Sequence, residues 1–286
     1  MLDSAAPTSL AALRSFLFAP ASDLRRAQRA LASPAHAAIL DLEDAVADAE
    51  KADARDIVRS LLSQVSDSGK LDRPARLLRV NGAETPFFEG DLALLQRIDV
   101  DAVVLPKASV AALELLPERF PPVYALVESA AGLREAFALA RSAHVVGLML
   151  GAVDLAADLG LGRLVDSTEL LFARSQLVRD SRAAGALAPI DGVWTQLDDP
   201  EGLIREAALA CALGMRGKLC IHPRQLDVVH AAFAASEQER AWAQRVLDAY
   251  DTAVSRGEGA IALNGELVDL AVAERARRLL SEEAPR

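Results

Sequence analysis

The stretch AAILDLEDAV, Ala37 to Val46, is an apolar run that ends in three carboxylates, Asp41, Glu43 and Asp44. Its apolar half is continuous and does not alternate with polar residues, as expected of a strand that is covered on both faces. Runs of the same kind recur along the chain, at residues 14–20, 37–44, 76–82, 101–107, 122–129, 144–154, 188–195 and 217–223. These runs predict a parallel sheet with one strand for each of them.

Helical patterns separate the runs, for example at residues 22–33, 129–142 and 199–214. We expect Ser22 to cap the first of these helices and Asp198 or Asp199 to cap the last, where Pro200 suits the first turn and Gly214 the end. The alternation predicts an α/β protein with a (β/α)8 TIM barrel. An open doubly wound sheet is the alternative, but no Gly-x-Gly-x-x-Gly follows the first run, which disfavours a dinucleotide-binding fold.

The last part of the chain departs from this alternation. Residues 236–257 predict one long helix, and Asn264-Gly265 between two apolar runs is a strong hairpin signal. A further helix is expected at residues 271–280. We therefore expect a C-terminal helix–hairpin–helix appendage that acts as a lid or an oligomerisation arm. The predicted domains are the barrel, residues 1–229, and the arm, residues 230–286.

Composition excludes several classes of protein. The 286 residues carry a formal net charge of −10, which disfavours binding to nucleic acid and to anionic membranes. The start MLDSAAPTSLAAL lacks the basic residues of a signal peptide, and the longest apolar stretch, residues 144–153, is about half as long as a membrane-spanning helix. We expect a cytoplasmic protein. A small anionic ligand remains compatible with the charge, because a local cation or a metal can bind it.

Polar side chains gather at the carboxyl ends of the predicted strands, where barrel enzymes place their active sites. Asp41 and Glu43 share one face of their strand, because alternate residues of a strand point to the same side. The other polar residues at strand ends are Asp44, Arg79, Asn81, Lys107, Glu128, Asp154 and His222. Three of them have a simpler structural explanation: Asp44 can cap the next helix, Lys107 can pair with a carboxylate of the second strand, and His222 can stabilise a turn.

The chemistry that suits this set is metal-assisted. Glu128 and Asp154 each stand alone in an apolar stretch, and two carboxylates without a supporting His or Cys favour Mg²⁺, with Mn²⁺ as a second possibility. The turn at Gly151 and Ala152 brings backbone N–H groups where an anionic substrate can approach. Arg79 can bind a substrate carboxylate or polarise a carbonyl group.

The chain also resembles the citrate lyase beta-subunit-like proteins of the HpcH/HpaI aldolase superfamily. The resemblance rests on segments that follow one another in family order: RSFLFAPASD, ILDLEDAVADAEKADAR, LLRVNGAETPF, VVLPKA, ALVESAAGL, GLMLGAVDLAADLG, AAGALAPIDGV, GMRGKLCIHPRQL and ALNGELVDLAVAERARRLL. It implies a (β/α)8 barrel that forms trimers or larger homo-oligomers such as hexamers.

The resemblance also implies roles for individual residues. Mg²⁺ would be bound by Glu128 and Asp154, and Arg79 would bind the substrate. Asp269, in the C-terminal segment, would be a catalytic acid that enters the site of a neighbouring subunit. Asp41 and Glu43 would lie at the mouth of the barrel, where they position Arg79 and the waters of the metal and contact the substrate.

The function that this resemblance implies is a carbon–carbon lyase, which cleaves a β-hydroxy acyl thioester of citramalyl, malyl or citryl type to an acetyl thioester and a 2-keto acid. Coenzyme A or an acyl carrier protein would carry the acyl group, and Arg14 and Arg25 could bind the phosphates of coenzyme A. One alternative is a subunit of an acyl-carrier lyase complex that binds keto acid and metal with little activity alone. Another is a thioester-free 4-hydroxy-2-keto acid aldolase. Relatives of that kind usually employ a basic histidine near the second strand, and we rank this alternative lower because His36 precedes that strand and so lies at its wrong end.

Overall fold

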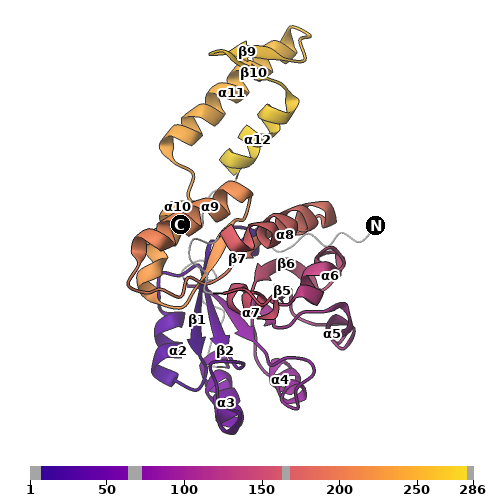
Figure 1. Ribbon diagram of the computed structural model, residues 1–286, viewed down its shortest axis with the longest axis vertical. Helices are drawn as coiled ribbons and strands as arrows, with labels where there is room; N and C mark the ends of the chain where they lie inside the picture. Colours follow the sequence, from indigo (N-terminus) through magenta and orange to yellow (C-terminus); the bar gives the residue numbers. More distant parts are fainter. Residues whose placement is uncertain (1–7, 64–72, 163–167, 282–286) are drawn as a thin grey trace. The chain divides into compact units, whose positions relative to one another are not determined.

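The computed structural model describes residues 8–63, 73–162 and 168–281. The parallel strands close into one barrel in sequence order (Figure 1). They are β1 (Ser15–Pro20), β2 (Ala37–Asp41), β3 (Ala75–Arg79), β4 (Ala102–Leu105), β5 (Val123–Val127), β6 (Val145–Leu150), β7 (Leu187–Asp191) and β8 (Gly217–Cys220). The predicted (β/α)8 barrel is confirmed, and the closed strand order excludes the open doubly wound alternative.

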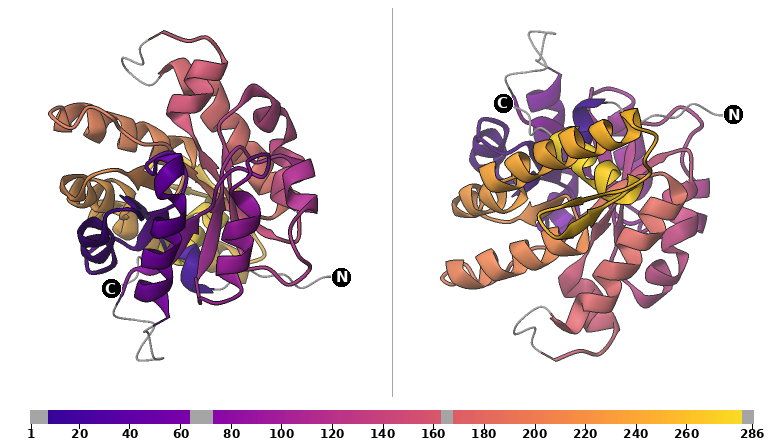
Figure 2. Two further views of the ribbon diagram at one scale, coloured as in Figure 1. Left: turned by 90° about the horizontal axis from the view of Figure 1, so that it is seen from below. Right: turned by 90° about the horizontal axis from the view of Figure 1, so that it is seen from above.

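Helices follow every strand and surround the barrel (Figure 2). A short helix α1 (Thr8–Ala11) precedes β1, and the others are α2 (Leu24–Leu31), α3 (Lys51–Leu62), α4 (Phe88–Leu95), α5 (Val110–Glu114), α6 (Ala130–Arg141), α7 (Ala152–Asp158), α8 (Leu171–Ala184), α9 (Pro200–Leu213) and α10 (Leu226–Phe233). Short 3₁₀ helices in the described part of the chain lie between them, namely η1 (Asp48–Glu50), η2 (Thr168–Leu170) and η3 (Pro223–Gln225).

The helix caps follow from local side-chain chemistry. Asp199 caps α9 by accepting a hydrogen bond from the N–H of Gly202, and Gly214 ends that helix with a positive φ of 98°, as predicted. The cap predicted for α2 is wrong by one residue, because Asp23 and not Ser22 accepts a hydrogen bond from the N–H of Arg26.

The alternation of side chains along the strands divides the core into two layers. Phe16, Ile39, Leu77 and Tyr124 point into the barrel and pack against one another. Their neighbours along the strands point outward and pack against the helices in a second cluster. Residues two positions further along a strand therefore continue the inner face towards its carboxyl end, which positions the site described below.

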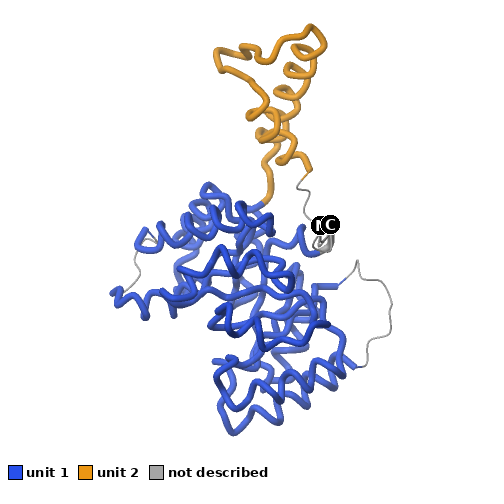
Figure 3. The backbone as a smooth tube through the Cα atoms, turned by 90° about the vertical axis from the view of Figure 1, so that its right-hand side faces the viewer, with its two compact units in different colours: residues 1–233 blue, residues 234–286 orange. Residues whose placement is uncertain are grey.

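The chain divides into two compact units, residues 1–233 and residues 234–286 (Figure 3). The division expected at residue 229 falls within α10. The second unit contains α11 (Glu237–Ser255), a hairpin of β9 (Ile261–Leu263) and β10 (Glu266–Val268), and α12 (Leu270–Ser281), packed on a small core of its own. Asn264 and Gly265 have φ values of 52° and 87°, the left-handed conformations that a two-residue hairpin turn requires.

Within the described parts of the chain, no helix has the length and apolar character needed to cross a membrane. Residues 1–7, on which part of the signal-peptide argument depends, lie outside the described residues.

Candidate active site

A cavity of about 330 Å³ opens at the carboxyl ends of the strands. The register of the barrel brings the predicted residues to it: Asp41 and Arg79 are direct neighbours across β2 and β3. Glu128 directly follows β5, and Asp154 lies in the first turn of α7, after β6. The residues that line the cavity are Phe18, Asp41, Asp44, Ala45, Arg79, Leu126, Glu128, Leu150, Gly151, Ala152, Val153, Asp154, Val193, Leu219 and Ile221.

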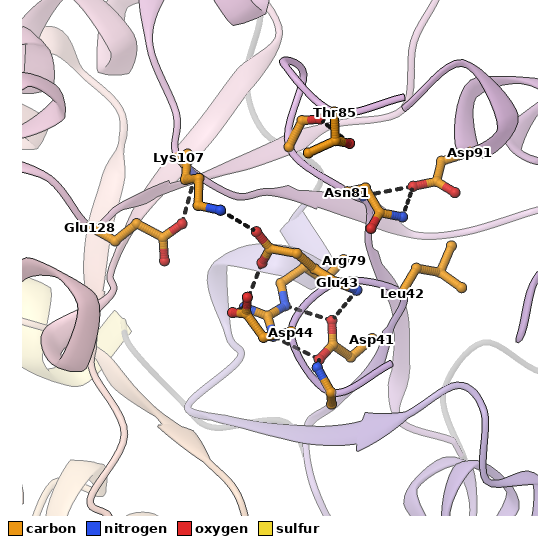
Figure 4. A network of polar contacts seen from close by, with 12 residues as sticks. Asp41, Leu42, Glu43, Asp44, Arg79, Asn81, Thr85, Asp91, Lys107 and Glu128 are labelled. Atoms are coloured by element: carbon orange, nitrogen blue, oxygen red, sulfur yellow. Dashed lines mark hydrogen bonds and ion pairs between the residues drawn. The ribbon is translucent and has the colours of Figure 1, made fainter. Parts of the chain in front are cut away.

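Arg79 is the centre of a network of carboxylates (Figure 4). Its Nε and Nη2 donate to the two carboxylate oxygens of Asp41, each at 2.7 Å. Its Nη1 lies 2.9 Å from Glu43 Oε2 and donates to Asp44 Oδ2 at 3.1 Å. Burial alone lowers the pKa of Arg79, but the hydrogen bonds and charge of Asp41, with the charges of the other two acids, raise it above its ordinary value. The guanidinium is therefore fixed in place and permanently charged.

The three acids at the end of β2 and in the loop after it, Asp41, Glu43 and Asp44, have different structural roles. Asp41 binds Arg79 with both carboxylate oxygens. It also accepts hydrogen bonds from the N–H groups of Glu43 and Ala45, so it stabilises the loop after β2 as well. We expected Asp44 to cap the next helix, and this is wrong. Its carboxylate points to Arg79, and the first helical residue beyond it is Asp48. Glu43 does not line the cavity and lies behind it, beside Arg79 and Lys107.

Lys107 connects the second strand to Glu128. Its ammonium lies 3.5 Å from Glu43 Oε1, which confirms the predicted pairing with a carboxylate of that strand. Its backbone N–H donates to Glu128 Oε1 at 2.6 Å. Lys107 adopts a φ of 46°, an uncommon left-handed conformation for a residue with a side chain. That conformation accompanies an N–H that points at Glu128 and fixes its carboxylate.

Glu128 and Asp154 together suit a metal ion. The pKa of Glu128 is raised to about 7, mainly by burial and also by the charge of Asp154, against the lowering effect of the Lys107 N–H. Asp154 has no hydrogen-bond or ion-pair partner among the described residues. No cluster of three or more His, Cys, Asp and Glu side chains suited to a metal occurs there either. Two carboxylates at one cavity, neither of which forms an ion pair with a described residue, fit a hard ion such as Mg²⁺, which keeps several water or substrate oxygens as ligands.

The role of Gly151 is to leave space for Glu128, and its N–H does not contact a ligand. That N–H donates to the Val127 carbonyl at 2.9 Å, so it is already used in the sheet. A Cβ at this position would lie 2.3 Å from Glu128 Cβ, so any side chain would displace the carboxylate. The N–H of Gly151 is therefore not available to an anionic ligand, although Gly151 and Ala152 both line the cavity, as the predicted substrate contacts require.

The two arginines expected to bind coenzyme A phosphates lie at different ends of the barrel. Arg14 directly precedes β1, so it lies at the amino end of the strands, where its guanidinium reaches the Ala11 carbonyl and only 4% of the residue is exposed. Arg25 lies in the first turn of α2, after the carboxyl end of β1, and is exposed. Arg14 and Arg25 therefore cannot form one phosphate site at the mouth.

Asp269 belongs to the second unit. It precedes α12, and its Oδ1 accepts a hydrogen bond from the N–H of Val272 at 3.0 Å, so it caps that helix. His222 caps η3, as expected of a turn residue: its Nδ1 accepts a hydrogen bond from the N–H of Arg224, and its own N–H donates to Gln225 Oε1. His36 accepts a hydrogen bond from the Arg14 N–H at the amino end of the barrel, far along the strands from the cavity.

Sequence reasoning missed the apolar part of the cavity, which includes Val193, Leu219 and Ile221. These residues look like ordinary strand residues because nothing polar marks them. The alternation of the inner face was the available signal: Leu219 lies on the same side of its strand as Ile221, and both come at the carboxyl end.

A family model described as HpcH/HpaI aldolase/citrate lyase matches residues 14–223. The citrate lyase beta subunit of Leuconostoc mesenteroides subsp. cremoris is 36% identical over 282 residues, which cover 93% of this chain and 92% of that protein. A (3S)-malyl-CoA thioesterase of Cereibacter sphaeroides is 34% identical over 259 residues, 90% of this chain and 89% of that one. The structure of the protein CitE from Mycobacterium tuberculosis, with magnesium, acetoacetate and coenzyme A, is similar with a TM-score of 0.80 and 36% identity, over 95% of this chain and 98% of that chain.

Proposed function

The chain belongs to the HpcH/HpaI aldolase/citrate lyase family, a family of oxo-acid lyases, and we propose that it cleaves a β-hydroxy acyl thioester to an acetyl thioester and a 2-keto acid. The acyl group is of citramalyl, malyl or citryl type. The observation that carries the proposal is a cavity of about 330 Å³ that Glu128 and Asp154 line together with the fixed guanidinium of Arg79. The relative with magnesium, acetoacetate and coenzyme A supports the same ligand classes.

The reaction breaks the bond between the hydroxyl-bearing carbon and the methylene carbon next to the thioester. The hydroxyl oxygen loses its proton and becomes the carbonyl of the keto acid, while the electron pair of the broken bond passes into a thioester enolate. That enolate gains one proton at carbon, so no net proton is consumed. Magnesium held by Glu128 and Asp154 would supply positive charge to the keto-acid oxygens, and Arg79 adds a hydrogen bond to the same oxygens.

We propose Asp269 as the acid that delivers the proton to the enolate carbon. In the reverse direction, it would remove a proton from the acetyl thioester. Asp269 Oδ1 is engaged in the cap of α12, so Oδ2 is the oxygen that would carry the proton. Asp269 would reach the site of a neighbouring subunit within a homotrimer or hexamer, with the second unit as its lid.

Coenzyme A or an acyl carrier protein would hold the acyl group. Of the two arginines predicted to bind its phosphates, only Arg25 stays in the proposal, because it lies on the carboxyl side of the barrel. Replacement of Arg25 by alanine should raise the KM for the coenzyme A thioester and leave Mg²⁺ affinity unchanged.

The test is an assay of keto acid release from citramalyl- and malyl-coenzyme A, with Mg²⁺ and with EDTA. Glu128→Gln keeps the acceptor for the Lys107 N–H, and Asp269→Asn keeps the cap of α12, so each removes the chemistry and spares the fold. We expect each variant to lose about 100-fold or more in kcat. Asp251→Asn, which changes an exposed carboxylate of the second unit, is the matched control and should retain wild-type kcat.

Three outcomes separate the alternatives. Cleavage that EDTA does not affect would refute the metal assignment. Keto acid and Mg²⁺ binding without cleavage of either thioester would favour the subunit of an acyl-carrier complex. Cleavage of a 4-hydroxy-2-keto acid would favour the thioester-free aldolase, which the cavity disfavours because none of the described residues that line it is a histidine.

A further inference from the structure

Lys51 is a buried lysine that does not line the cavity and that binds the loop after β2. It is the first residue of α3 and is 5% exposed. Its ammonium donates to the Leu42 carbonyl at 2.8 Å and to the Glu43 carbonyl at 2.7 Å. It also lies 5.5 Å from the centre of the Phe87 ring, which is close enough for a cation–π contact. The buried charge of Lys51 is therefore stabilised by dipoles and by a ring.

The position of Lys51 is unfavourable on two grounds. The helix dipole opposes a cation in the first turn of a helix, and a buried ammonium costs free energy unless an anion balances it. In the parts of the chain that the structure describes, Lys51 forms no ion pair with a carboxylate. What this unfavourable position provides is two short hydrogen bonds to one loop, which indicates a role for Lys51 in fixing that loop.

The loop, residues 42–47, is held from two sides. On one side, the carboxylate of Asp41 accepts two backbone N–H groups of the loop. On the other side, Lys51 donates to two backbone carbonyl groups of the loop. Leu42 is fixed at both of its backbone polar groups, because its N–H donates to the Arg79 carbonyl at 3.0 Å. The acid and the lysine together determine the path of the loop.

The loop carries two of the acids that contact Arg79. Glu43 Oε2 forms an ion pair with Arg79 Nη1 at 2.9 Å, and Asp44 Oδ2 accepts a hydrogen bond from the same nitrogen at 3.1 Å (Figure 4). Asp44 also lines the cavity. The candidate metal ligands belong to other segments, since Glu128 follows β5 and Asp154 lies in α7. A change in the path of the loop would therefore disturb Arg79 more than the metal site.

We infer that Lys51 is a positioning residue: it holds the loop after β2 in the path that places the two acids of the loop on Arg79, the residue that binds the keto acid. The inference rests on the proposed function and adds to it a residue that lies outside the cavity. Asp41 holds Arg79 through two further hydrogen bonds, so loss of Lys51 should disturb the guanidinium only in part. The expected cost is about 10-fold in keto acid affinity.

The test compares Lys51→Met with a matched control, Arg216→Met. Arg216 is also buried and also donates to two backbone carbonyls, those of Ala11 and Ala188, but it directly precedes β8 and so lies at the amino end of the barrel. Each variant should unfold about 5 °C below wild type, since each leaves buried carbonyl groups unpaired. Equal losses of thermal stability make the comparison of binding informative.

Calorimetry on the full-length protein measures the Kd for Mg²⁺ alone and, with Mg²⁺ present, for glyoxylate, pyruvate and oxaloacetate. Lys51→Met should bind these keto acids about 10-fold more weakly than wild type, and Arg216→Met should bind them with wild-type affinity. Both variants should bind Mg²⁺ with wild-type affinity. In an Arg79→Lys background, which keeps a cation but has no guanidinium to orient, Lys51→Met should cause no further loss of keto acid affinity.

Lys51→Gln gives the same comparison if Lys51→Met does not fold. Its side chain is one atom shorter and keeps two N–H donors for the carbonyls, so the expected loss of keto acid affinity is smaller, about 3-fold. Wild-type keto acid affinity in a folded Lys51 variant would overturn the inference and leave Lys51 a purely structural role. An equal loss of Mg²⁺ affinity, or an undiminished loss in the Arg79→Lys background, would overturn it as well. If wild type binds no keto acid in the presence of Mg²⁺, the proposed function itself fails.

Discussion

Glu43 is a buried carboxyl group whose local environment opposes its charge. Its pKa is raised to about 8, mainly by burial and also by the charge of the neighbouring Asp44, against the lowering effect of Arg79. Neither carboxylate oxygen accepts a hydrogen bond from a described residue, although Arg79 Nη1 and Lys107 Nζ lie within ion-pair distance. Glu43 therefore lowers the stability of the folded protein at every pH at which it is ionised in the unfolded chain. Destabilising groups of this kind are typical of functional sites.

A Glu43→Gln variant should remove this cost. The folded pKa of Glu43, about 8, is above the unfolded value of 4.5, so the wild-type protein loses stability as the pH rises from 4.5 through 8. Glutamine has no charge to bury, so the variant should gain stability relative to wild type between pH 5 and pH 8, on the order of 2 kcal/mol. Urea unfolding at the two pH values measures it. An identical pH dependence in both proteins would contradict the raised pKa.

At the scale of elements, a stacked histidine pair fastens α10 to the amino end of the barrel. The rings of His36 and His230 lie 4.4 Å apart and nearly parallel. Ser15 Oγ accepts the N–H of His36 and lies 2.8 Å from His230 Nε2, and His36 Nδ1 accepts the N–H of Arg14. Burial, together with the charges of His230 and Arg14, lowers the pKa of His36 to about 4. This contact therefore needs an unprotonated His36.

Because the pKa of His36 is lowered on folding and that of Glu43 is raised, the two groups change the stability of the protein with pH in opposite directions. The stabilising effect of neutral His36 is complete above the unfolded pKa of 6.5 and is lost as the pH falls towards 4. His36→Asn keeps an acceptor for the Arg14 N–H but cannot take up the proton. Between pH 7 and pH 4.5 we expect the variant to lose about 1 kcal/mol less stability than wild type, because the ring is only partly buried. Thermal unfolding at several pH values checks this, and equal losses in both proteins would argue against the pair as a pH-sensitive contact.

At the scale of the whole molecule, the barrel and the second unit have separate cores, and the proposed catalytic residues are divided between them. Arg79 lies in the first unit and Asp269 in the second. If Asp269 acts in a neighbouring subunit, Arg79→Ala and Asp269→Asn should each be inactive alone. Co-expression should restore about a quarter of the wild-type activity, because about one site in four then combines an intact Arg79 with an intact Asp269. No recovery in verified mixed oligomers would place Asp269 in the site of its own subunit.

Much of the fold was predictable because its signals are local. Continuous apolar runs separated by helical patterns depend only on neighbouring residues, and so do the cap at Asp199 and the turn at Asn264-Gly265. Glu128 and Asp154 were named from the sequence as candidate metal ligands because each stands alone in an apolar stretch, and the structure places both at one cavity; their binding of a metal stays a prediction. The same locality explains the error at Ser22, because Asp23 next to it offers an equally good capping oxygen.

The sequence by itself determined the closed barrel, the family and the charged residues Asp41, Arg79, Glu128 and Asp154 at its mouth, because strand pattern and strand ends follow from the order of residues. Tertiary structure decided how those residues are used. Only the register between β2 and β3 shows that Asp41 pairs with Arg79, and only barrel closure brings Val193 and Ile221 to the same cavity. The use of the Arg79 N–H groups by Asp41 and Asp44, the separation of Arg14 from Arg25 and the set of charged residues at the cavity all depend on contacts between distant segments, which no local pattern encodes.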